Sequence, residues 1–255
     1  MHQILAISRY TLLEARRARL PLLFAVVLGA LLALALFAAE LAVIESQRVQ
    51  TAFYAAGIRL AAVFIVAVHV IASVTREFDD QGLDTLLALD LPRSHYILGK
   101  LGGFLALGGI IGAMACLPLL IMAPAIAAVQ WGVALGLELA VVIAFALFCV
   151  VAFGQFMPSA AVVLAFYVLA RGITAIRLMS AHPLAGADTL SHDVSRWLIE
   201  GLALLLPALD RWPQTTWLID APGSWHGVLG LLLEAALYIA LLAGAAMVDF
   251  HRRNF

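Results

Sequence analysis

Residues 76–100 read REFDDQGLDTLLALDLPRSHYILGK and form a polar interruption in a strongly apolar chain. The acids in this stretch are Glu77, Asp79, Asp80, Asp84 and Asp90. Apolar runs at residues 51–74 and 97–121 flank it, and each is long enough to cross a bilayer as a helix. The stretch therefore predicts a helical membrane protein in which residues 76–96 connect two spans on the aqueous side.

The composition of the whole chain agrees with this prediction. Hydrophobic residues make up 64% and charged residues 12% of the 255 residues, and the mean hydropathy is +1.04. Soluble domains contain roughly 45–50% apolar and about 25% charged residues. A large soluble domain is therefore excluded, and we expect a single transmembrane domain over residues 1–255.

The apolar runs predict six spans in an all-α integral membrane protein. We expect Pro118 and Pro124 to kink or end the third span early, and the stretch from Gly154 to Ser159 to form the turn before the fifth. The predicted spans cover residues 20–44, 51–74, 97–121, 132–153, 159–178 and 227–248.

Two further segments are expected to lie at the membrane surface. Residues 1–19 predict an N-terminal interfacial helix with Arg9, Arg16 and Arg17 opposite its apolar face. The external connection, residues 179–226, contains an apolar run at 194–206 that is too short to span and predicts a re-entrant or interfacial helix. An interfacial aromatic belt is expected from Trp197, Trp212, Trp217 and Trp225.

Lys and Arg near the predicted span ends favour both termini on the cytoplasmic side. This orientation places nine of them inside: Arg9, Arg16, Arg17, Arg19, Arg76, Arg93, Lys100, Arg252 and Arg253. It leaves four at the outer side: Arg48, Arg177, Arg196 and Arg211. The polar segment is therefore expected in the cytoplasm.

Charged residues inside the spans are the candidates for chemistry. By counting along the predicted spans, four of them share a layer on the order of 10 Å below the outer surface: Arg59, Glu138, Arg171 and Glu234. They are interpreted either as interhelical ion pairs that fix packing or as an outer gate or polar cargo site. His69, nearer the inner face, is interpreted as a satisfied helix-contact histidine or as a further polar gate candidate.

The familiar signatures of soluble catalysis are missing from the sequence. No phosphate-binding loop, nucleophile elbow or metalloprotease motif occurs. The histidines lack ligand spacing, Cys116 and Cys149 lie in apolar runs, and we expect neither a metal site nor a cofactor bound by this chain. No nucleic-acid partner is expected.

The polar segment also carries an apolar ridge at helical spacing, formed by Leu83, Leu86 and Leu87. With Arg76-Glu77, Gly82, Pro92-Arg93 and Gly99-Lys100, it resembles the cytoplasmic segment of ABC-2 permeases, the membrane subunits of ATP-binding-cassette exporters with the ABCG-like (type V) fold. The resemblance implies a coupling helix at residues 76–92 that docks on an ATPase subunit. The implied contact residues are Glu77, Phe78, Asp79, Asp80, Gly82, Leu83, Asp84, Leu86, Leu87 and Arg93.

The resemblance implies a permease subunit in the bacterial inner membrane, not itself an enzyme. Its partners would be two cassette ATPase subunits, which hold ATP and Mg²⁺, a second permease copy and membrane lipid. A family alternative transmits motion to a periplasmic partner during metalloenzyme or cytochrome maturation. Two further hypotheses are an intramembrane enzyme that uses the four span charges and a membrane anchor or assembly factor.

Overall fold

The computed structural model describes residues 2–42, 44–79, 93–181 and 190–252. Within these ranges every regular element is a helix. The helices are α1 (His2–Arg17), α2 (Leu20–Leu41), α3 (Ser46–Asp79), α5 (Arg93–Cys116), α6 (Leu119–Met122), α7 (Ala125–Phe153), α8 (Phe156–Ala181), α9 (Leu190–Leu205), α10 (Thr216–Ile219), α11 (Trp225–Arg252) and the 3₁₀ helix η1 (Leu209–Arg211).

Six of these helical segments are long and apolar enough to cross a membrane. They are Leu20–Leu41, Ser46–Asp79, Ser94–Met122, Ala125–Phe153, Phe156–Met179 and Trp225–Phe250. The predicted all-α chain with six apolar helices is confirmed at this level. The predicted interruption in the third span is also confirmed, because α5 ends at Cys116 and the short α6 follows Pro118.

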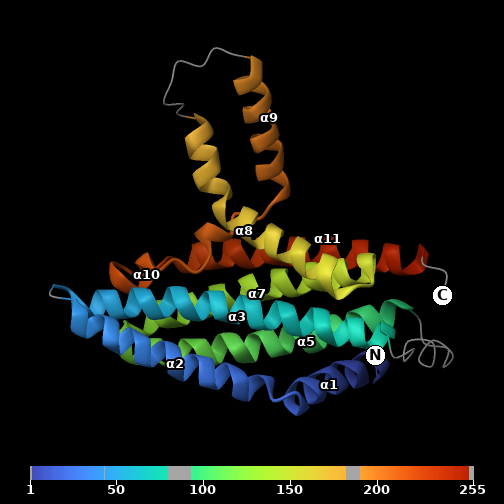
Figure 1. Cartoon of the computed structure of the whole chain (residues 1–255), viewed down its shortest axis with the longest axis horizontal. Coiled ribbons are helices and arrows are strands. Elements are labelled where there is room, and N and C mark those ends of the chain that lie inside the picture. Colours follow the sequence, from blue (N-terminus) through green and yellow to red (C-terminus); the bar gives the residue numbers. More distant parts are fainter. Residues whose placement is uncertain (1, 43, 80–92, 182–189, 253–255) are drawn as a thin grey trace.

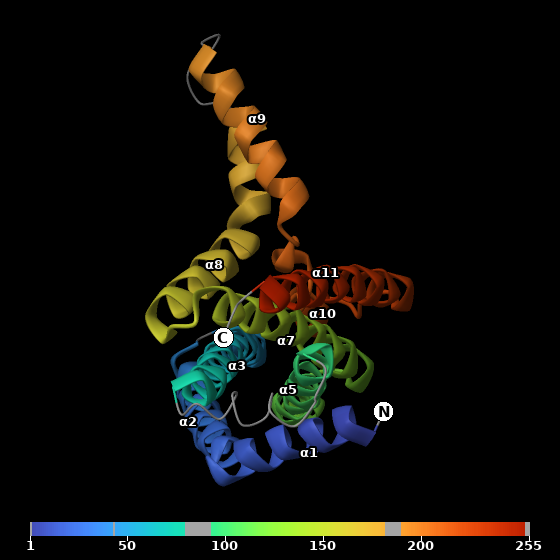
Figure 2. The same cartoon turned by 90° about the vertical axis from the view of Figure 1, so that its right-hand side faces the viewer.

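The long helices form a bundle whose centre is α7 (Figure 2). In the most apolar stretch of α7, 67% of residues are buried, against 11% in the corresponding stretches of α2 and α11. Since α3, α5, α8 and α11 all pack on α7, this helix meets other helices on most of its circumference. The exposed apolar sides of α2 and α11 are the surfaces that suit contact with lipid.

The bundle has an α1 end and an α10 end, called after the helices α1 and α10 that lie there. At the α1 end lie α1, the start of α5 and the end of α11 (Figure 1). At the α10 end, η1 and α10 pack on α8, α3 and α7. The start of α1 and the end of α11 thus lie at the same end of the bundle.

Helix α1 packs mainly on α5, through a seam of glycines. A Cβ at Gly99 would lie 2.7 Å from the Ile7 Cβ, and one at Gly103 would lie 2.6 Å from the Thr11 Cβ. The predicted apolar face of residues 1–19 therefore packs against protein in the described structure, with Thr11 and Ala15 buried. The arginines of α1 stay exposed.

The connection after α8 differs in detail from the sequence-based prediction. Helix α8 changes direction, and its final turns and α9 form a hairpin that runs away from the bundle (Figures 1 and 2). The helix expected at 194–206 exists but begins earlier, at Leu190. Its re-entry into a membrane stays a prediction. Trp212 does not belong to an interfacial belt, because it is fully buried.

Candidate functional site

The four charged residues predicted to share a layer do not form one cluster. Arg59 of α3, Glu138 of α7 and Arg171 of α8 come together, and we call them the outer triad. Glu234 of α11 instead lines a separate pocket of about 270 Å³ with Arg177 and Arg211. Its helix faces the base of the α8–α9 hairpin, a detail that counting along a span does not reveal.

The outer triad joins three helices to the connection that covers the α10 end. Arg171 donates to the backbone carbonyl of Leu209 at 2.9 Å, and Arg59 donates to that of Pro213 at 3.0 Å. Both acceptors belong to the stretch around η1. The two arginines therefore hold the stretch from Leu209 to Pro213 against α3 and α8.

Glu138 supplies the counter-charge of the triad but is poorly satisfied. It is fully buried, and its Oε1 lies 3.7 Å from Nη1 of Arg171. Tyr167 is close, yet neither carboxylate oxygen accepts a well-formed hydrogen bond within the described part of the chain. A buried carboxylate without hydrogen bonds is costly, which makes this the least settled polar group in the described core.

A second cluster of buried charge lies at the α1 end and was not anticipated from the sequence. Lys100 of α5 is 1% exposed and pairs with Glu14 of α1, at 3.3 Å, and with Glu77 of α3. Tyr96 donates to Glu77 at 2.5 Å, and Ser73 donates to Glu14 at 2.8 Å. We call these five residues the inner network. They link the three helices α1, α3 and α5.

The sequence signal for this network was the pair of charges that flank the polar segment. The sequence predicts Glu77 as an ATPase contact and Lys100 as part of the start of a span. In the structure the Glu77 carboxylate contacts Tyr96 and Lys100 within the chain. Its role at an ATPase interface, like that of Phe78 and Asp79, stays a prediction.

Most of the predicted coupling helix falls outside the described residues. Asp80, Gly82, Leu83, Asp84, Leu86 and Leu87 lie in residues 80–92, and Arg93 is described only as the first residue of α5. What the structure does place are the two ends of this segment. The end of α3 and the start of α5 are tied together by Glu77, Tyr96 and Lys100.

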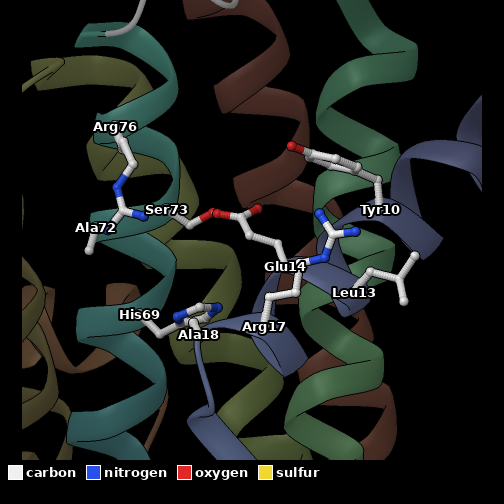
Figure 3. A pocket seen from close by; sticks show the side chains of 9 residues that line it. All are labelled: Tyr10, Leu13, Glu14, Arg17, Ala18, His69, Ala72, Ser73 and Arg76. Atoms are coloured by element: carbon white, nitrogen blue, oxygen red, sulfur yellow. The ribbon is translucent and has the colours of Figure 1, made fainter.

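His69 lies beside the inner network and contacts a neighbouring helix, but its side chain is not fully satisfied, which differs from the sequence-based prediction. Its ring packs edge-on against Phe104 of α5, with centroids 6.1 Å apart. Its Nε2 is buried and has no hydrogen-bond partner among the described residues. Figure 3 shows the ring at the edge of a pocket between α1 and α3, with Glu14, Arg17 and Arg76 around it.

The described residues thus contain two buried charge clusters at different depths, one satisfied and one only in part. One cluster links α1, α3 and α5, and the other links α3, α7 and α8 to the stretch around η1. This pattern alone assigns no chemistry to the chain. Comparison with protein-family models and with curated proteins finds no match for this chain.

Proposed function

We propose that this chain is the membrane-spanning permease subunit of an ATP-driven exporter of the ABC-2 kind. The observation that supports this most is the link between the ends of the polar segment. Residues 80–92 connect α3 to α5, and the inner network ties these two helices to each other and to α1. A force on residues 80–92 would therefore move α1, α3 and α5 together.

The proposed mechanism follows from this linkage. The chain has no phosphate-binding loop of its own, so energy would arrive through contact between residues 76–92 and an ATPase subunit. The ridge of Leu83, Leu86 and Leu87 would anchor that contact, with the acids at its rim. Rigid-body movement of α1, α3 and α5 would then open the α10 end, where the outer triad holds the cover over the bundle.

Co-purification of the tagged chain in mild detergent tests the proposal. We expect a cassette ATPase to accompany the wild type and to be lost from Leu86→Asp/Leu87→Asp. The matched control is Thr85→Asp/Ala88→Asp, which adds the same charge on the opposite face at helical spacing. Retention by the control and loss from the ridge variant support the docking helix. A wild-type chain that purifies without an ATPase contradicts the exporter proposal.

A second candidate, transmission of motion to an external protein, draws support from the α8–α9 hairpin. The hairpin extends away from the bundle, and Trp197, Leu198 and Leu202 on α9 are exposed. A photo-crosslinking residue at position 197 distinguishes the candidates. A crosslink to a different protein favours transmission, whereas one to a second copy favours a dimeric permease.

The intramembrane-enzyme hypothesis draws less support from the geometry. It requires Arg59, Glu138, Arg171 and Glu234 to share one water-filled cavity. Glu138 is fully buried, and Glu234 lines a pocket with Arg177 and Arg211 instead. The exporter therefore remains the function that the described residues favour.

A further inference from the structure

A pocket of about 390 Å³ lies between α1 and α3 at the α1 end of the bundle. Figure 3 shows that helix α1 supplies Tyr10, Leu13, Glu14 and Arg17, while α3 supplies His69 and Arg76. None of the functions considered above uses this pocket. Its volume is enough for a polar headgroup of a few heavy atoms.

The charges around the pocket do not balance. Arg17 and Arg76 face it from opposite sides, and neither forms an ion pair within the described residues. The Glu14 carboxylate is already engaged by Lys100 and by the Ser73 hydroxyl. The pocket lining therefore carries two arginines against one carboxylate. The excess of one positive charge favours a ligand with a single negative charge.

The edge of the pocket offers an unused polar atom. Nε2 of His69 is buried and has no hydrogen-bond partner in the described structure, and Figure 3 shows the ring turned toward the pocket. Buried ring nitrogens are ordinarily hydrogen-bonded. An oxygen of a bound ligand would satisfy this atom.

The rim combines charge with apolar surface. Leu13 is 51% exposed and Tyr10 is 60% exposed, beside the exposed guanidinium of Arg17. A ligand that fills this site completely would carry its negative charge next to a hydrocarbon part. Helix α1 also carries Arg9 and Arg16, so the surroundings attract anionic lipid in general.

We propose that this pocket binds the phosphodiester headgroup of an anionic membrane phospholipid. A phosphodiester has one negative charge and two non-bridging oxygens. Arg17 and Arg76 bind these oxygens from α1 and α3 through charge-assisted hydrogen bonds, and His69 contacts the headgroup at the edge of the pocket. The acyl chains leave across Leu13. The bound lipid thus joins α1 to α3, and this site is independent of the exporter proposal.

Native mass spectrometry of the purified full-length chain, titrated with defined lipids, tests the site. The probes are phosphatidylglycerol, phosphatidylcholine with the same acyl chains, and soluble glycerol 3-phosphate as competitor. The test variant is Arg17→Gln/Arg76→Gln. The matched control is Arg9→Gln/Arg16→Gln, which removes the same charge from exposed α1 positions outside the pocket. Melting temperatures establish that both variants are folded.

We expect one phosphatidylglycerol to bind the wild type and the control with similar affinity. The test variant should bind it about tenfold more weakly, because two charge-assisted contacts are lost. Equal losses in both variants would overturn the site in favour of general attraction to α1. Equal binding of phosphatidylcholine would overturn recognition by charge. Full competition by glycerol 3-phosphate at equal concentration would overturn a lipid as the source of the phosphate.

Discussion

The inner network and the outer triad are both buried groups of opposite charges, but only one is satisfied. At the α1 end, Lys100 has two carboxylate partners, and each carboxylate accepts a further hydroxyl hydrogen bond. In the outer triad, Glu138 at the middle of α7 has one ion pair at 3.7 Å and no well-formed hydrogen bond within the described residues. A satisfied network fixes one arrangement, whereas a partly satisfied one costs less to rearrange. The comparison indicates that the inner network is rigid and that the outer triad rearranges more easily.

The largest expected effect comes from removing the central cation of the inner network. Lys100→Met leaves Glu14 and Glu77 facing each other without their cation, and we expect a loss of about 3 kcal/mol in stability. The unfolding midpoint in detergent should fall by roughly 6–12 °C. Glu138→Gln should cost about 1 kcal/mol or less, because both arginines keep their carbonyl acceptors.

A second substitution shows whether the loss reflects unpaired charge. Adding Glu77→Gln to Lys100→Met should recover part of the midpoint. If Glu138→Gln destabilises the protein as much as Lys100→Met does, the distinction between a rigid inner network and a more easily rearranged outer triad is wrong.

The next effect is steric and displaces α1, which carries Glu14. Gly103→Ala places a Cβ 2.6 Å from the Thr11 Cβ and 2.9 Å from the Ser8 carbonyl oxygen. We expect about 2 kcal/mol of destabilisation from this overlap. Gly109→Ala on the same helix has open space and should raise stability by up to about 1 kcal/mol. Equal thermal midpoints for the two variants would contradict the tight seam.

The smallest expected effect comes from removing one tyrosine hydroxyl beside each cluster. Tyr96 and Tyr167 are both buried, at 5% and 6% exposure. Tyr96→Phe removes a hydrogen bond to a carboxylate and should cost about 1.5–2 kcal/mol. Tyr167→Phe should change stability by less than about 0.5 kcal/mol, since its hydroxyl has no well-formed partner in the described residues. Equal losses in chemical denaturation would place a well-formed hydrogen bond in the outer triad as well.

Hydropathy was sufficient to predict the six apolar helices, because long apolar runs leave few alternatives in a bilayer. The interruption near Pro118 followed from the missing N–H and the ring of proline. The partners of side chains were harder to foresee. The grouping of Arg59, Glu138 and Arg171 depended on how α3, α7 and α8 rotate about their axes, and depth alone placed Glu234 with them wrongly.

The inner network escaped prediction for a related reason. Glu77 and Lys100 lie at opposite ends of a polar segment, and their sequence separation gave no sign that they meet. The same holds for Glu14, which lies in a helix expected to face lipid. These contacts arise from the close approach of α1 to α5, which depends on Gly99 and Gly103 and on the curvature of the chain at Arg19, where φ is 55°.

The glycine seam also sets an order of events during synthesis. Helix α1 leaves the ribosome before α5, so its docking surface on α5 does not exist until residues 99–103 have been made. During that interval α1 has only its own exposed arginines and apolar side chains to hold it at the membrane surface. Docking of α1 must therefore follow the synthesis of α5, and the inner network forms only after α3 and α5 are both in place.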